Sequence, residues 1–185
     1  MAIIIPIRYF LVQPFFVRGA SMEPTFEDGE YLLIDQLSYR FREPRRGEVI
    51  VFRFPQDESQ YFIKRIIGLP GDLLKMQDGL VYVNGEPIDE PYVQELCRTV
   101  TCRDREWQLG EDEFFVLGDN RNASQDSHDF GPINREQIVG KAWVRYWPPS
   151  SWALIDDHHH YEPPQNLPTP TITPTDPPGD IPGGI

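Results

Sequence analysis

This 185-residue chain has little lysine, cysteine and histidine, and it has no long uninterrupted apolar run. It contains three lysines, two cysteines and four histidines, three of which form the run at 158–160. His128 is then the one histidine of the region predicted to fold. Its neighbours in Asp126-Ser127-His128-Asp129 do not form a catalytic triad by adjacency, because successive residues of a strand face opposite ways. The formal net charge of −12 argues against nucleic acid as a partner.

The amino-terminal stretch is apolar but too short and too interrupted to cross a bilayer by itself. Pro6, Arg8, Gln13 and Pro14 break residues 1–17, and a spanning helix needs about 20 apolar residues. We expect residues 1–14 to be a partial membrane anchor or an interfacial segment, with a soluble start as the alternative. A cleavable signal peptide is disfavoured, since no basic region precedes the apolar stretch.

The middle of the chain is rich in strand signals. Turn sequences such as Leu69-Pro70-Gly71-Asp72 and Asn84-Gly85 separate runs of β-branched and aromatic residues. No extended apolar pattern with a helical period competes with them. The sequence predicts an all-β fold of coiled, packed antiparallel sheets over residues 15–152, with residues 86–110 as an insertion. The predicted strands cover 30–34, 48–52, 61–67, 80–83, 113–117 and 139–147.

Two further segments carry weaker signals. Cys97 and Cys102 have four residues between them and no metal-like partners nearby, so they form a short disulfide or stay as two thiols. Residues 153–185 are Pro-rich and acidic, and we expect a disordered tail there. The run Asp156-Asp157-His158-His159-His160 is interpreted as a solvated linker rather than a metal site. The sequence predicts no metal and no cofactor.

Lys64 and Ser21 are the candidate chemical groups. In a strand over 61–67, Lys64 shares a face with Phe62 and Ile66. Burial there would lower the lysine pKa and make the neutral amine a usable base, whereas a lysine at a sheet edge would extend its amine to water. Ser21 lies in the turn-forming stretch Gly19–Thr25. A serine hydroxyl and a desolvated amine together suggest nucleophilic catalysis.

Four blocks between residues 15 and 147 carry a family resemblance. They are GASMEPT at 19–25, RGEVIVF at 46–52, KRIIGLPGD at 64–72 and GDNRNASQDS at 118–127. In this order they resemble type I signal peptidases. The resemblance implies a membrane-associated serine endopeptidase that removes signal peptides from exported preproteins, with its catalytic domain on the extracytoplasmic face of the cytoplasmic membrane. It also implies that residues 86–110 vary within the family.

The resemblance assigns roles residue by residue. Ser21 attacks the scissile carbonyl, and neutral Lys64 takes the serine proton and later returns it to the leaving amine. Ser124 would hydrogen-bond the lysine amine, and Asp126 would brace the same loop. Gly19 stands where some relatives place a serine that donates to the oxyanion, so the second donor is open. His128 stands where relatives carry an arginine paired with the loop aspartate, which predicts a pH-dependent pairing with Asp126.

Substrate recognition is expected to use strand pairing. Residues 15–20 and 61–63 would enclose an extended peptide, and the family cuts after small residues in an A-x-A pattern. Exposed aromatic residues, including Trp143, Trp147 and Trp152, suggest contact with membrane lipid, although packing in the sheet is the simpler expectation for Trp143. The expected pocket residues are Val17, Met22, Phe26, Phe62 and Ile63.

Two other functions fit parts of the pattern. Self-cleaving repressor-type proteins share a Ser-Lys dyad on a related β scaffold, but they carry a DNA-binding amino-terminal domain. A catalytically inactive β domain that binds exported peptides is the second alternative. The presence of Ser21, Lys64 and Ser124 together disfavours it, because a binding module has no use for these three residues.

Overall fold

The structure is a computed structural model that describes residues 12–98 and 101–155. The predictions for residues 1–11, and for the tail and its histidine run beyond residue 155, lie outside the described residues. Within the described part, no helix is long and apolar enough to cross a membrane.

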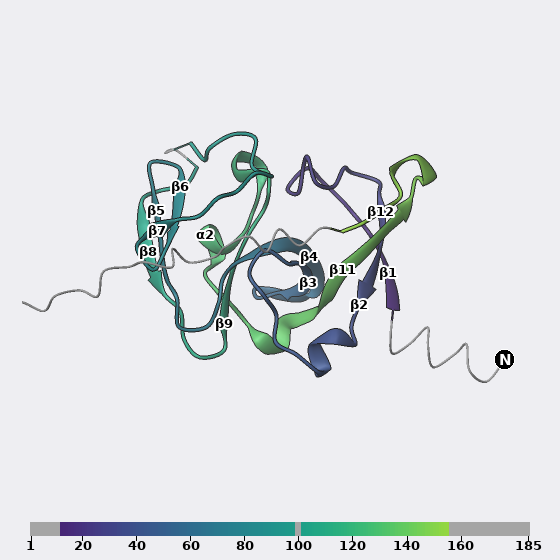
Figure 1. Ribbon diagram of the computed structural model, residues 1–185, viewed down its shortest axis with the longest axis horizontal. Helices are drawn as coiled ribbons and strands as arrows, with labels where there is room; N and C mark the ends of the chain where they lie inside the picture. The colour runs from purple at the N-terminus through teal and green to yellow at the C-terminus, as the bar shows by residue number, and fades with distance from the viewer. Residues whose placement is uncertain (1–11, 99–100, 156–185) are drawn as a thin grey trace, which may run out of the picture.

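The larger of the two described sheets has eight strands, and every strand pair in it is antiparallel (Figure 1). The strand order is β1-β2-β11-β3-β4-β9-β10, and β12 pairs with β11. The strands are β1 (Val12–Phe16), β2 (Tyr31–Asp35), β3 (Val49–Phe54), β4 (Asp57–Gly68), β9 (Glu113–Leu117), β10 (Ile133–Asn134), β11 (Ile138–Trp147) and β12 (Ala153–Leu154).

A second, four-stranded antiparallel sheet lies at one end of the molecule, beside β9 and away from β1 and β2 (Figure 1). Its order is β7-β6-β5-β8. The strands are β5 (Leu73–Gln77), β6 (Leu80–Val83), β7 (Glu86–Pro87) and β8 (Arg105–Gln108). The remaining elements are short: α2 (Ser127–Phe130), and the 3-10 turns Ser38–Arg40, Arg121–Ala123, Arg135–Gln137 and Pro149–Ser151.

The predicted all-β class is confirmed. The Asn84-Gly85 turn joins β6 to β7 with positive φ at both positions, as a two-residue hairpin turn requires. The predicted strands do not include β5, β8 or the two-residue strands β7, β10 and β12. Strand β5 reads Leu-Leu-Lys-Met-Gln and has no β-branched residue, so its pairing with both β6 and β8 decides its conformation. At the other end, β12 and the packing of Ile155 extend the folded part slightly beyond residue 152.

Strand β4 connects the three apolar clusters of the core. Ile63 packs against a cluster with Val17 and Leu32, Ile66 belongs to a second cluster around Phe52, and Ile67 belongs to a third beneath the four-stranded sheet. Each face of this strand therefore becomes more buried toward Gly68. A polar side chain in the second half of β4 must accordingly be paired or neutral.

Candidate active site

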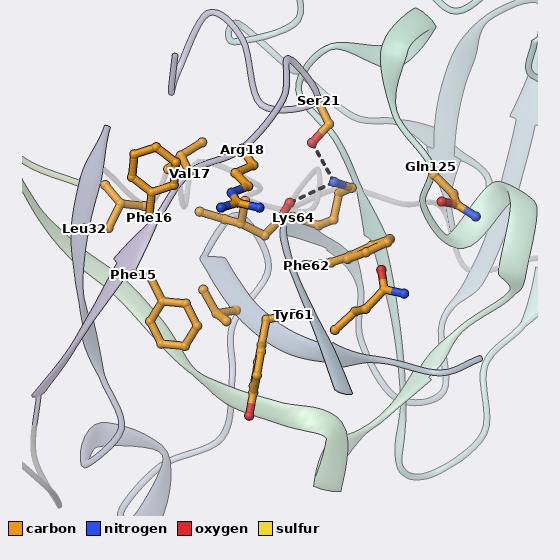
Figure 2. Close-up of a pocket in the computed structure, with 13 residues that line it drawn as sticks. Phe15, Phe16, Val17, Arg18, Ser21, Leu32, Tyr61, Phe62, Lys64 and Gln125 are labelled. Carbon is orange, nitrogen blue, oxygen red and sulfur yellow. Dashed lines mark hydrogen bonds between the residues drawn. The ribbon is translucent and has the colours of Figure 1, made fainter. Parts of the chain in front are cut away.

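The side chains of Ser21 and Lys64 are in contact, although the two residues are 43 positions apart in the sequence. Ser21 lies in the turn after β1, and Lys64 projects from the middle of β4. Lys64 Nζ lies 2.7 Å from Ser21 Oγ and 2.9 Å from the Ile63 carbonyl oxygen (Figure 2). The hydroxyl of Ser21 is therefore within proton-transfer reach of the amine.

The lysine is buried and does not extend its amine to water. The residue is 4% exposed, and its Nζ lies 5.5 Å from the centre of the Phe62 ring. Burial disfavours the ammonium form and lowers the pKa of Lys64 to about 8, although the negative charges of Asp126 and Asp119 oppose this shift. About one amine in ten is then neutral at pH 7.

The turn that carries Ser21 is held by the loop after β9. The Asn120 N–H donates to the Ser21 carbonyl oxygen at 3.1 Å, and Thr25 Oγ1 donates to Asp119 at 2.5 Å. Gly118 lies so close that an added Cβ would stand 2.4 Å from the Ser21 carbonyl oxygen. The glycine in GDNRNASQDS is required here because the two loops touch through their backbones.

Asp119 is in turn fixed by a buried ion pair that the sequence reading did not find. Arg65 donates from Nε and from Nη2 to the two carboxylate oxygens, at 2.9 and 2.7 Å, and both side chains are fully buried. The same guanidinium lies 4.0 Å from the centre of the Tyr92 ring. Arg65 follows Lys64 directly, so β4 supplies the candidate base on one face and the support for the nucleophile turn on the other.

Ser124 lies in the site without the expected contact. Its Oγ is buried and has no hydrogen-bond partner among the described residues, while the lysine amine contacts Ser21 and the Ile63 carbonyl instead. The Ser124 hydroxyl packs against Gly118, where an added Cβ would approach it to 2.2 Å. The predicted hydrogen bond from Ser124 to Lys64 is therefore absent from this structure.

Asp126 connects the loop to β9 and to His128. One carboxylate oxygen accepts the Gly118 N–H at 2.9 Å, and the other lies 2.5 Å from His128 Nδ1. His128 Nε2 lies 3.3 Å from Asp129. The hydrogen bond with Asp126 is the main cause that raises the pKa of His128, and Asp129 adds to it, while burial and Arg121 oppose it.

This geometry predicts that His128→Arg alters the pH dependence of activity. Above its raised pKa, His128 is neutral and leaves the Asp126 charge uncompensated, which holds the Lys64 pKa up. A permanent guanidinium would keep Asp126 paired, so we expect the acid limb of kcat/KM to move to lower pH in the variant. The pairing energy of wild-type His128 is complete below about pH 6.5 and is lost as the pH rises through its raised pKa. Identical profiles from pH 6 to 10 would refute the coupling.

A cleft of about 360 Å³ opens beside the two residues (Figure 2). Val17, Phe62 and Ile63, three of the predicted pocket residues, line it. Met22 and Phe26 do not line the cleft; they are fully buried in the cluster that contains Val17. The other lining residues, which the sequence reading did not select as pocket residues, are Phe15, Phe16, Arg18, Leu32, Val51, Gln60, Tyr61 and Gln125, besides Ser21 and Lys64.

Two unpaired strand edges border this cleft. Among the described strands, β1 ends the large sheet, and its one partner is β2. Strand β4 pairs with β3 from Asp57 onward but with β9 only from Arg65, so its stretch 57–64 has one free edge. Free backbone N–H and C=O groups on both sides suit an added peptide strand.

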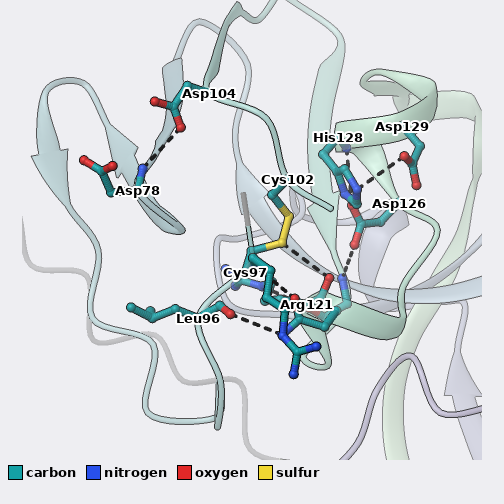
Figure 3. The surroundings of a disulfide bond; sticks show 12 residues. Asp78, Leu96, Cys97, Cys102, Asp104, Arg121, Asp126, His128 and Asp129 are labelled. Atoms are coloured by element: carbon teal, nitrogen blue, oxygen red, sulfur yellow. Dashed lines mark hydrogen bonds and ion pairs between the residues drawn. A yellow bond between two sulfur atoms is a disulfide. The ribbon is translucent and has the colours of Figure 1, made fainter. Parts of the chain in front are cut away.

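A disulfide joins Cys97 and Cys102, with 5.7 Å between their Cα atoms (Figure 3). The bridged segment contacts the turn 121–123: Arg98 N–H donates to Asn122, and Asn122 Nδ2 donates to the Leu96 carbonyl oxygen. Arg121 is almost fully buried and pairs with Glu90. The disulfide-bridged segment is thus attached to the loop that carries Ser124 and Asp126.

A serine hydroxyl against a buried lysine amine, on an antiparallel β scaffold, is the arrangement of serine peptidases that use lysine where others use histidine. Comparison with known proteins agrees with this class. A family model described as "Signal peptidase, peptidase S26" matches residues 1–147.

Individual relatives give the same result. The chain is 40% identical over 180 residues to a probable signal peptidase I-2 of Synechocystis, covering 92% of this chain and 81% of that protein. It is 36% identical over 165 residues to a signal peptidase I of Bacillus caldolyticus, with 83% and 90% covered. A crystal structure of a signal peptidase I from Enterococcus faecalis superposes with a TM-score of 0.47 and 30% identity, covering 54% of this chain and 97% of that one. The chain therefore belongs to the signal peptidase family, peptidase S26, and is a serine endopeptidase of the signal-peptide-processing class.

Proposed function

We propose that the chain cleaves signal peptides with a Ser21-Lys64 dyad. The observation that carries the proposal is the 2.7 Å separation of Ser21 Oγ from the buried Nζ of Lys64, whose pKa is lowered to about 8. Neutral Lys64 takes the hydroxyl proton as Ser21 Oγ bonds to the scissile carbonyl carbon. The same proton then passes to the leaving amine, and the acyl-enzyme ester is hydrolysed by water.

The Ser21 backbone N–H is the proposed first oxyanion donor. It donates to none of the described residues, so it is available for a developing negative charge beside the hydroxyl. Gly19 has a positive φ and no side chain that could donate. The second donor is therefore a backbone N–H or a water. Ser124, whose hydroxyl lies next to Gly118, is proposed to orient the amine once a substrate is bound.

The proposed substrate is an extended peptide with small residues at the first and third positions before the cut. Between the edges of β1 and β4, alternate side chains of an added strand point to one face. That face is the apolar floor formed by Val17, Leu32, Val51 and Ile63, which is shallow because Val17, Leu32 and Val51 also pack in the core. We therefore expect small side chains at these two positions.

A cleavage assay tests this function. A peptide with an Ala-x-Ala site, presented in detergent or lipid, should be cut after the second alanine by the wild-type chain. Ser21→Ala should lower kcat/KM by at least about 10³-fold, whereas Ser150→Ala, an exposed serine outside the cleft, should not. Cleavage that persists in Ser21→Ala would refute the nucleophile, and peptide binding without any cleavage by the wild type would favour a binding module.

We also propose that the cleft faces a membrane surface, with the folded domain on the extracytoplasmic side, where a disulfide is stable. Trp143 is 48% exposed, so the expectation that it packs in the sheet is wrong. It belongs to a set of exposed apolar side chains on β1, β2, β11, β12 and the turn before β12. The set comprises Phe16, Tyr31, Trp143, Trp147, Trp152 and Leu154. Tryptophan and tyrosine rings favour the interfacial region of a bilayer.

Liposome flotation checks this surface with the full chain. The double variant Trp147→Ser/Trp152→Ser is expected to reduce the bound fraction several-fold, because it removes two large rings from the proposed contact. Phe41→Ser is the control, since Phe41 is 82% exposed and lies outside the set. Equal binding of wild type and double variant would refute the surface, as would equal losses in the double variant and the control.

A further inference from the structure

Arg18 gives the cleft a charge that the proposed reaction does not use. The formal net charge of the chain is −12, yet the described residues that line the cleft include no aspartate or glutamate. The basic side chains among them are Lys64 and Arg18. Lys64 must be neutral to act as the base. In the active form of the enzyme, Arg18 is therefore the source of positive charge on the described cleft wall.

The guanidinium of Arg18 makes no ion pair within the described part of the chain. It lies 5.8 Å from the centre of the Phe16 ring, and the exposed Arg18 is drawn between Phe16 and Lys64 among the residues that line the cleft (Figure 2). The acidic residues nearest to Arg18 along the chain are Glu23, Glu27 and Asp28, and none of these described residues forms an ion pair with it. Asp28 Oδ1 accepts the Gly19 N–H instead, at 2.7 Å. An exposed cation without a carboxylate partner, three residues before the nucleophile, is available to a bound peptide.

The alternation of side chains along a strand decides which residue of the bound peptide lies near Arg18. Val17 is buried and faces the apolar floor, whereas Phe16 and Arg18 are exposed and face the opposite side. In a substrate strand between β1 and β4, the first and third residues before the cut point toward the floor. The second residue points away from it, toward the side of Arg18.

We propose that Arg18 is a specificity-determining residue, which favours precursors with a carboxylate side chain at the second position before the cut. The inference rests on the proposed function, because it takes the peptide register from the Ser21-Lys64 site. An ion pair at an exposed rim is weak, so the preference is a bias among substrates rather than a requirement. The preferred substrates are thus small-acidic-small sequences within the broader small-any-small class.

Three peptides that differ only at this middle position test the proposal: Ala-Glu-Ala, Ala-Gln-Ala and Ala-Lys-Ala. The wild type should show a kcat/KM for the Glu peptide about fivefold above that for the Lys peptide, chiefly through KM, with Gln between them. Arg18→Lys should keep this order, and Arg18→Glu should reverse it. Raising the salt concentration from 0.05 to 0.5 M should shrink the difference, because the contact is exposed.

Arg103→Glu is the matched control, since it changes net charge equally from an exposed position outside the cleft. It should retain the preference for Glu. Equal kcat/KM values for the Glu and Lys peptides in the wild type would overturn the inference while leaving the cleavage function intact. Reversal by Arg103→Glu as well would also overturn it, because net charge would then be the cause. Failure of the wild type to cut even the Gln peptide would instead overturn the proposed function, and the inference with it.

Discussion

Lys64→Met is expected to lower kcat/KM by at least about 10³-fold while making the folded chain more stable. The loss follows from removal of the general base, which contributes roughly 10²–10⁴-fold, together with loss of the group that returns the proton to the leaving amine. The gain in stability follows because the substitution removes an ionisable amine from a residue that is only 4% exposed. Peptide cleavage and urea denaturation at pH 7 measure the two effects on the same protein.

The stability effect has a definite pH window. The unfolded chain keeps the lysine proton up to about pH 10.5, whereas the folded chain releases it near pH 8. The penalty of burying the ammonium is therefore complete below pH 8 and fades between pH 8 and 10.5. This penalty amounts to about 3 kcal/mol. The methionine variant avoids the penalty but loses the two hydrogen bonds of the amine, so its net gain in stability at pH 7 is about 1–2 kcal/mol.

Lys75→Met is the matched control, because Lys75 is a partly exposed lysine of the four-stranded sheet with a long ion pair of 3.9 Å to Glu106. It should leave both activity and stability close to those of the wild type. In the wild type, kcat/KM should rise with pH to a plateau above about pH 8, as the Lys64 amine loses its proton. Turnover by Lys64→Met near the wild-type rate would refute the assignment of the base.

Arg65→Met is expected to destabilise the fold by about 3–5 kcal/mol. It leaves the Asp119 carboxylate buried, with the Thr25 hydroxyl as its remaining side-chain donor, and breaking one side of a fully buried ion pair costs this much. Activity should fall as well, because Asp119 and the adjacent Asn120 hold the turn that carries Ser21. Denaturant unfolding at neutral pH measures the change in the free energy of unfolding.

A double substitution separates the loss of the pair from the loss of packing. Arg65→Met/Asp119→Leu replaces both charges by apolar side chains and should recover most of the stability that the single variant loses. If the double variant is as unstable as the sum of the two single variants, the ion pair has no coupling energy and packing around Tyr92 and Thr25 is the cause. Lys75→Met again provides the comparison, as an exposed pair whose loss costs less than about 1 kcal/mol.

Local sequence patterns predicted much of the fold and both of the proposed reacting groups. Runs of β-branched and aromatic residues identified β2, β3, β4, β6, β9 and β11 within a few residues, and Asn84-Gly85 identified a hairpin turn. Alternation along 61–67 placed Lys64 beside Phe62, as observed. These features depend on neighbours in the chain, so a single sequence contains them. β5 depends on partners up to 35 residues away and was missed for that reason.

The sequence by itself therefore determined the all-β class, the candidate nucleophile and base, and the resemblance that led to the signal peptidase family. Tertiary structure decided how the site is held. The Arg65-Asp119 pair joins residues 54 positions apart, and Gly118 is confined by the backbone of Ser21 and the side chain of Ser124. Tertiary packing also removed the expected Ser124 contact, buried Met22 and Phe26, and left Arg18 beside the cleft without an ion pair to any described residue. The physical reason is that burial and pairing are set by contacts across the sheets, which no local pattern of residues specifies.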